Sequence, residues 1–347
     1  MQRIQSLDVL RGLIMVLMAI DHVRVYSGMP AGGAEPAIFF TRWITHFCAP
    51  GFTFFAGTAA FLYGIKLGDT KKLAKYLFTR GLMLVVLEIT IIRLFWTFNL
   101  NLGEFMLAGV IWMLGWCMVL LGTMVRMRAM TIGIIGVLII GGQQLFGFVS
   151  DSPYWQFIYT TGADGPPWIA ILYVIVPWIG VMMAGYGFGT IITSAKRDKW
   201  CYIIGLSSIA LFLIVGAFTS GDIYQLLNQR KYPASQMYLL MTLGPLIALV
   251  PVAEKAKGVV VGFLETFGRV PFFYYLAHIL VIHVSALVVN NILFGASHQE
   301  WYTIAPFANV PEENRWGLGV LYFVFVVDVA ILYFLSKWYS KRKLKFI

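Results

Sequence analysis

Long apolar stretches alternate with short polar loops along nearly the whole chain. A helix that crosses a membrane needs roughly 20 mostly apolar residues, and runs of that kind recur about ten times here. The pattern therefore predicts an all-α fold, a polytopic integral membrane helical bundle formed by a single transmembrane domain over residues 1–347. The expected spans are 7–28, 46–65, 76–97, 104–125, 129–148, 169–193, 200–219, 236–253, 270–293 and 317–337.

The basic residues fall mainly in every second loop. Lys and Arg gather at 66–75, 126–128, 196–199, 255–269 and in the C-terminal tail, whereas the opposite loops hold Arg42, Arg230, Lys231 and Arg315. Because cytoplasmic loops carry the excess of Lys and Arg, both termini are expected in the cytoplasm. The longer loops 29–45, 149–168, 220–235 and 294–316 then face the exoplasmic side, where they are expected to wall an outward-facing site.

The amino-acid composition is typical of a membrane protein and argues against other classes of protein. Hydrophobic residues make up 59% of the chain and charged residues 12%, with a mean hydropathy of +0.79, which excludes a soluble domain. The net charge of +10 follows from the basic loops, so no nucleic-acid partner is expected. The first apolar run carries charged residues and is read as a span rather than a signal peptide, which favours a bacterial inner membrane. Scattered cysteines and the lack of HExxH, GxSxG or phosphate-loop motifs predict no metal site.

The first span carries a polar stripe. His22 follows Arg11 by eleven residues, which brings it back to within about 20° of Arg11 and roughly 16 Å farther along the helix. Asp8, Arg11 and His22 therefore share one face, expected to point into the bundle because ionisable groups in a membrane rarely face lipid. For Asp8 and Arg11, an ion pair that only orients the helix is the open alternative.

Other ionisable residues lie at membrane depth. His46 begins the second span at the level of His22, and Asp21 sits about 100° around the first helix from His22. His278 and His283 are five residues apart, which puts them on different helix faces and argues against a shared metal. The remaining members, Glu88, Asp328 and His283, are expected to make interhelical hydrogen bonds.

Several segments resemble a known group. The segment LDVLRGLIMVLMAIDH resembles the first helix of the transmembrane acyltransferase superfamily, in which an Arg is followed eleven residues later by a His. The segment HFCAPGFTFFAGTAAFLYG resembles the second helix of the heparan-α-glucosaminide N-acetyltransferase group. GRVPFFYYLAHIL resembles that group's late helix, with His278 as the matching histidine, and LYFLSKWYSKRKLKFI resembles its terminal helix and basic tail.

This resemblance implies a membrane acyltransferase that moves an acyl group, expected to be acetyl, from cytosolic acetyl-CoA to an amine or hydroxyl of an exoplasmic sugar or glycan. The animal enzyme of the group has its proposed catalytic histidine in the first exoplasmic loop, but residues 29–45 contain none. The chemistry then falls to His22 or His46, and the resemblance to the wider acyltransferase superfamily implies His22, as general base or acyl carrier. His46 and Asp21 are expected to orient His22 or relay its proton.

The acyl-CoA side of the site is assigned to other residues. Arg11, with Asp8 beside it, is expected to attract the phosphates or the pantetheine carbonyls of CoA, and Arg93 and His278 to line the route. Membrane lipids are the expected surroundings, and a homodimer is left open. The rival interpretation is a proton-coupled transporter or flippase, suggested by Gly-rich spans and buried acids. Against it, polar residues concentrate in the first helix, and no matching pair of broken helices is visible.

Overall fold

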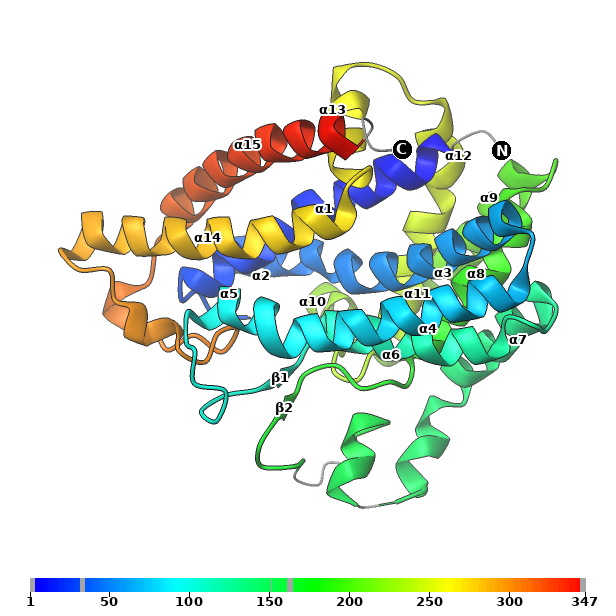
Figure 1. The fold of residues 1–347 in the computed structure, drawn as a ribbon, viewed down its shortest axis with the longest axis horizontal. Helices are drawn as coiled ribbons and strands as arrows, with labels where there is room; N and C mark the ends of the chain where they lie inside the picture. Colours follow the sequence, from blue (N-terminus) through cyan, green and yellow to red (C-terminus); the bar gives the residue numbers. More distant parts are fainter. Residues whose placement is uncertain (1–3, 32–34, 151, 161–164, 344–347) are drawn as a thin grey trace. The chain divides into compact units, whose positions relative to one another are not determined.

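The computed structural model describes residues 4–31, 35–150, 152–160 and 165–343 (Figure 1). These residues are overwhelmingly helical, which confirms the predicted all-α class. The chain divides into two compact units that are described separately below. Unit 1 contains Ala49–Thr90 and Met106–Val252, and unit 2 contains Ile4–Cys48, Ile91–Phe105 and Ala253–Ile347.

Unit 1 is built from helices that pack in pairs. Helix α7 packs on α8, α4 on α6, and α9 on α11. Its helices are α3 (Cys48–Leu67), α4 (Thr70–Leu87), α6 (Val110–Met124), α7 (Ala129–Gly141), α8 (Trp178–Ile192), α9 (Arg197–Thr219), α10 (Ile223–Leu227) and α11 (Gln236–Ala248), with the 3-10 turns η3 (Gln143–Phe148) and η4 (Pro153–Phe157). The boundary between the two units falls within α12 (Val250–Lys255).

Glycines let these paired helices approach closely. A Cβ built on Gly81 of α4 would lie 2.5 Å from the carbonyl oxygen of Gly115 in α6, and one on Gly115 would lie 2.6 Å from that of Gly81. Such small-residue contacts drive helix packing in a membrane, where lipid removes the hydrophobic driving force. The Gly-rich composition of the spans therefore has a packing explanation in this pair.

Unit 2 is arranged around α1 (Gln5–Tyr26). Helix α1 packs against α13 (Val259–Gly268), α14 (Pro271–Phe294), α15 (Leu318–Lys343) and the 3-10 turn η1 (Ile44–Phe47), and Figure 1 shows α14 and α15 running beside it. The other elements are α2 (Pro36–Trp43), α5 (Arg93–Thr97), η5 (Gln299–Tyr302) and η6 (Glu312–Asn314). The π-helix η2 (Glu88–Ile92) connects α4 to α5.

Five helices among the described residues are long and apolar enough to cross a membrane. They are Pro36–Leu67, Arg197–Thr219, Gln236–Lys255, Pro271–Phe294 and Leu318–Arg342. Helix α1 has 22 residues but carries Asp8, Arg11, Asp21 and Arg24, and four further apolar helices are shorter. These helices confirm an apolar helical membrane architecture, while the number of ten spans stays a prediction.

Two predicted spans begin as strands instead of helix. In 104–125 the helix begins at Val110, after strand β1 (Leu107–Ala108), and in 169–193 it begins at Trp178, after strand β2 (Ala170–Ile171). The two strands pair in parallel, with Leu107 opposite Ala170. In a short apolar run, the spacing of apolar residues does not distinguish a strand from a helix. The predicted spans therefore included these residues in the helices that follow them.

Candidate functional site

Two histidines from distant parts of the chain meet inside unit 2. His22 lies near the end of α1 and His278 lies in α14, and the two helices pack together. Nδ1 of His22 lies 2.6 Å from Nε2 of His278, and the rings are stacked with centroids 4.7 Å apart. His278 is fully buried and His22 is half-buried. The structure therefore joins two residues that the sequence had assigned to different tasks.

The backbone around His278 determines which nitrogen carries the proton. Nδ1 of His278 lies 3.1 Å from the Tyr274 carbonyl oxygen and 2.5 Å from that of Tyr275. Carbonyl oxygens only accept, so Nδ1 of His278 is the protonated nitrogen and Nε2 of the neutral ring is the acceptor. His22 then donates from Nδ1–H, and this tautomer puts the His22 lone pair on Nε2. In this arrangement His278 orients His22, whose free Nε2 can act as a base or a nucleophile.

A third ring contacts His22. Trp96 of α5 meets it edge-on, with ring centroids 4.6 Å apart and planes at 64°. Trp96 also stacks on Tyr26 of α1 and is 5% exposed. Neither Trp96 nor Tyr26 was identified from the sequence. With aromatic residues at 16% of the chain, no spacing distinguishes these two rings from ordinary packing.

Asp21 is paired with an arginine of its own helix. Its Oδ1 accepts hydrogen bonds from Nε and Nη2 of Arg24 at 3.1 and 3.0 Å, and Nη1 of Arg24 donates to the Met29 carbonyl oxygen at 2.9 Å. These contacts fix the end of α1, one turn beyond His22. The expected role of Asp21 beside His22 stays a prediction.

His46 lies in η1, which packs against α1. The side chain is 3% exposed, and Nδ1 lies 3.0 Å from the Trp43 carbonyl oxygen. Cys48, two residues later, donates from its thiol to the Ile14 carbonyl oxygen at 3.4 Å and so ties this segment to α1. His46 thus belongs to a turn that packs against α1, the helix that carries His22. Its catalytic role stays a prediction.

Asp8 and Arg11 lie where α1 packs closely on α13. Asp8 is 5% exposed, and a Cβ on Gly268 would lie 1.9 Å from its carbonyl oxygen. Arg11 is half-buried, and its Nε donates to the Leu7 carbonyl oxygen at 3.1 Å. Met15 and Met18, which lie between Arg11 and His22 along α1, are buried.

Arg93 holds the loop that follows α5. It is 3% exposed, and its guanidinium donates to the carbonyl oxygens of Asn99, at 2.8 Å, Asn101 and Phe105. A planar guanidinium with several donors suits this task of collecting backbone oxygens. The contacts give Arg93 a structural function, and a contact with CoA stays a prediction.

Three polar residues make the interhelical bonds expected of them. Glu88 accepts from the backbone N–H of Ile111 at 3.2 Å, at the first turn of α6, within unit 1. Asp328 of α15 accepts from the Ser285 hydroxyl of α14 at 2.6 Å. His283 of α14 lies with Nδ1 2.8 Å from the Phe95 carbonyl oxygen. These contacts confirm that the three residues tie elements together.

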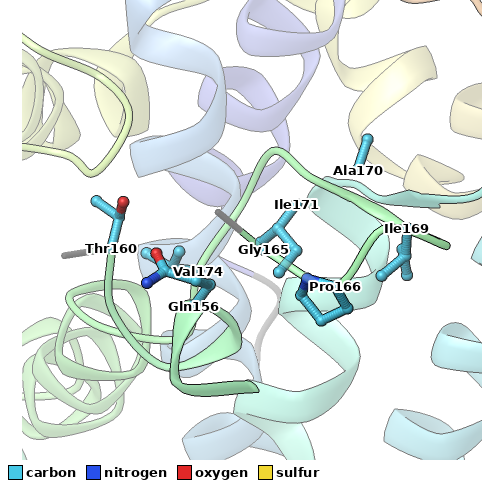
Figure 2. Close-up of a pocket in the computed structure, with 8 residues that line it drawn as sticks. All are labelled: Gln156, Thr160, Gly165, Pro166, Ile169, Ala170, Ile171 and Val174. Carbon is cyan, nitrogen blue, oxygen red and sulfur yellow. The ribbon is translucent and has the colours of Figure 1, made fainter. Parts of the chain in front are cut away.

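Unit 1 contains a separate cavity of about 280 Å³ (Figure 2). Its polar side chains are Gln156 and Thr160, and the rest of its lining is backbone and apolar groups. The lining residues are Gln156, Thr160, Gly165, Pro166, Ile169, Ala170, Ile171 and Val174. Because no acid, base or nucleophile of catalytic strength is among them, this cavity is not the candidate active site. Across the described residues there is also no group of three or more His, Cys, Asp or Glu side chains arranged to hold a metal ion.

Comparison with known families agrees with the helical pattern. A family model described as heparan-alpha-glucosaminide N-acetyltransferase, catalytic, matches residues 3–230, well over half of the chain. No curated protein matches the chain. Within the matched residues lie His22, His46, Arg11 and Arg93, whereas His278 lies beyond them. The histidine pair therefore combines a matched residue with one from the late helix.

Proposed function

This chain belongs to the heparan-alpha-glucosaminide N-acetyltransferase family, and from that premise we propose that it takes acetyl from cytosolic acetyl-CoA and transfers it to an exoplasmic sugar or glycan. Family membership makes it an acetyltransferase, and its apolar helices make it an integral membrane protein. The acceptor atom in this proposal is an amine nitrogen or a hydroxyl oxygen. The observation that carries the proposal is the hydrogen bond between His22 and His278.

In the proposed reaction His22 acts as general base. Its Nε2 takes the proton from the acceptor amine or hydroxyl, the acceptor atom bonds to the acetyl carbonyl carbon, and the bond to the CoA sulfur breaks. His278 stabilises the imidazolium that forms because its Nε2 accepts the Nδ1–H of His22. The proton then passes from His22 to the departing thiolate. An acetyl-imidazole formed at the same Nε2, followed by attack of the acceptor, uses the same orientation.

The donor side of the proposed site follows α1 toward its first turns. Arg11 is assigned to the phosphates or pantetheine carbonyls of CoA, because a half-buried cation held by its own helix attracts such groups. Asp8, buried one turn earlier, positions that end of the helix against α13. Arg93 contributes by holding the loop after α5, and His278 by orienting His22.

Two further residues have supporting roles in this proposal. Asp21 acts through Arg24, whose guanidinium it orients against the end of α1. His46, buried in η1 beside α1, is the second proton carrier on the acceptor side. Both residues are expected to influence turnover less than His22, because the proposal assigns the proton transfer with the acceptor to His22.

The proposal includes a membrane topology. The whole chain is one catalytic domain with ten spans, both termini lie in the cytoplasm, and the membrane is a bacterial inner membrane whose lipids surround the bundle. This topology rests on the distribution of Lys and Arg among the loops. It puts the far end of α1, with His22, in the exoplasmic half, opposite the cytosolic source of acetyl-CoA. A homodimer is compatible with it.

The test is acetyl transfer by the purified protein. Radiolabelled acetyl-CoA is supplied with glucosamine or its oligomers, and wild type is compared with His22→Ala and with His298→Ala, which removes a histidine of the loop after α14. We expect His22→Ala to lower turnover at least about 100-fold, with His298→Ala close to wild type. Wild-type turnover in His22→Ala would contradict the assignment. Uptake driven by a pH gradient in liposomes, without acetyl transfer, would instead indicate a transporter.

A further inference from the structure

Helix α5 is anchored at its end by three side chains from three other elements. The Phe95 carbonyl oxygen lies 2.8 Å from Nδ1 of His283 in α14. The Trp96 carbonyl oxygen accepts from the Tyr26 hydroxyl of α1 at 2.7 Å. The Thr97 carbonyl oxygen accepts from Nε2 of Gln299 in η5 at 2.8 Å. Three consecutive backbone carbonyls of α5 are thus each bound by a side chain from a different element.

This anchoring holds the end of α5. Helix α5 continues without a break from the π-helix η2, and the last carbonyls of a helix have no partner within the helix. Phe98 ends the helix in the left-handed region, with φ of 45°. The end of α5 is therefore held by α1, α14 and η5, the first two of which also carry His22 and His278.

The residue that this anchoring places most firmly is Trp96. Its carbonyl is bound by Tyr26, and its indole stacks on the ring of the same tyrosine with centroids 5.8 Å apart and planes 7° from parallel. The indole then meets His22 edge-on at 4.6 Å. His22 is contacted by Trp96 on one part of its ring and by His278, stacked at 4.7 Å, on another.

We propose that Trp96 is a positioning residue for His22: held by Tyr26, it keeps the imidazole in the orientation that donates Nδ1–H to His278. This inference rests on the proposed function in so far as it assigns His22 the chemistry. An imidazole on a half-buried helix end has other rotamers, and a ring fixed on two sides loses them. As a result, the lone pair on Nε2 of His22 keeps one direction, which proton transfer or capture of the acetyl group requires.

The kinetic test separates positioning from general stability. Trp96→Leu removes the edge contact and the stacking, Trp96→Phe keeps an aromatic ring, and Tyr26→Phe removes only the hydroxyl that holds the Trp96 carbonyl. Thr58→Val is the matched control, because it removes a hydroxyl that donates to the Gly185 carbonyl oxygen at 2.9 Å within unit 1 and touches neither α5 nor its anchoring residues. Tyr26 and Thr58 are both completely buried.

We expect the losses to fall on kcat while KM for acetyl-CoA stays unchanged. Trp96→Leu should lower kcat by about 10- to 100-fold and Tyr26→Phe by about fivefold, because small misplacements of a catalytic group have effects of this size. Trp96→Phe should retain most of the activity, and Thr58→Val should match wild type. Wild-type kcat in Trp96→Leu, or equal losses in Tyr26→Phe and Thr58→Val, would overturn the proposal.

A spectroscopic measurement decides the proposal independently of activity. In protein labelled with ¹⁵N at histidine, the imidazole nitrogen shifts report which nitrogen of His22 carries the proton, and His22→Ala assigns the signals among the five histidines. We expect the Nδ1–H form of His22 in wild type and Trp96→Phe, and a mixture of tautomers in Trp96→Leu. An unchanged His22 signal in Trp96→Leu would refute positioning. If wild type transferred no acetyl, the proposed function would fail while this measurement still decided the role of Trp96.

Discussion

Nδ1 of His22 and Nε2 of His278 lie 2.6 Å apart although the two residues are 256 positions apart in the chain. The bond joins α1, inside the residues that match the acetyltransferase family, to α14, outside them. The orientation of His278 is in turn determined by the carbonyls of Tyr274 and Tyr275, one turn earlier in α14. The late helix is therefore part of the candidate active site and contributes more than packing.

Replacing His278 should reduce turnover without removing the base. In His278→Phe, Nδ1–H of His22 loses its acceptor, so neither the tautomer nor the imidazolium is stabilised, and turnover should fall by about 100-fold or more. His278→Gln offers an amide oxygen as acceptor and should recover part of that loss. Steady-state acetyl transfer with each purified variant measures both effects.

The comparison needs proof that the variants fold. His298→Ala serves as the control, since His298 lies in the loop after α14 and bonds Glu300 instead of the histidine pair. Each variant should elute from size-exclusion chromatography as wild type does. If His278→Phe turned over at the wild-type rate, His22 would act without an orienting partner.

Replacing Arg93 by lysine should loosen the loop after α5. The guanidinium reaches the carbonyl oxygens of Asn99, Asn101 and Phe105 together, and a single ammonium group cannot span them. These bonds are only partly buried, and the loss of such a hydrogen bond costs about 0.5–1.5 kcal/mol. Arg93→Lys should therefore melt at a lower temperature and be cut earlier by protease between residues 98 and 105.

The matched substitution is Arg80→Lys on the exposed part of α4, where the guanidinium lies over the Tyr76 ring. Its melting temperature and proteolysis should resemble those of wild type. Equal stability of Arg93→Lys and Arg80→Lys would show that the loop does not depend on the buried guanidinium.

The sequence indicated candidate residues for the site but not the contacts that they make. The helical period put Asp8, Arg11 and His22 on one face of α1, and the cost of a charge facing lipid predicted that this face points into the bundle. In the structure Asp8 is buried, whereas Arg11 and His22 are half-buried. Neither rule refers to a second helix, so His22 and His278 were given different tasks. Their meeting depends on how α1 and α14 cross, which local periodicity does not encode.

The anchored end of α5 shows a second limit. Tyr26, His283 and Gln299 bind main-chain carbonyls, and any residue has a carbonyl, so no sequence signal marks the acceptors. The strands β1 and β2 were missed for a related reason, because two-residue apolar segments look the same in either structure. Contacts through the backbone are therefore the part of this fold that sequence reasoning does not reach.

Stability should depend on pH through the cap of α4. Asp69 accepts from the backbone N–H groups of Lys71 and Lys72 at 2.8 and 3.2 Å, and the bonds from Lys72 and then Lys71 lower the pKa of its carboxyl below the ordinary value. A lowered pKa in the folded state means that the contribution is complete above the unfolded pKa and is lost as pH falls through the folded pKa.

The measurement is melting temperature against pH for wild type and Asp69→Asn, whose amide oxygen still caps the helix but does not titrate. Wild type should be the more stable near neutral pH, and the difference should shrink as the solution becomes acidic. A difference that stayed constant from pH 7 to the acid limit would show that the carboxylate charge contributes nothing.

The close crossing of α1 and α13 should tolerate no side chain at position 12. A Cβ on Gly12 would lie 1.9 Å from the Leu264 carbonyl oxygen, so Gly12→Ala must push the two backbones apart, at a cost of about 1–3 kcal/mol. Because α1 also carries His22, the same displacement should lower acetyl transfer as well as melting temperature. Gly262→Ala is the matched control, since a Cβ at Gly262 of α13 meets nothing within 4 Å and alanine favours a helix by up to about 1 kcal/mol over glycine. Equal stability and turnover of Gly12→Ala and Gly262→Ala would mean that the crossing has room to adjust and that the position of His22 does not depend on it.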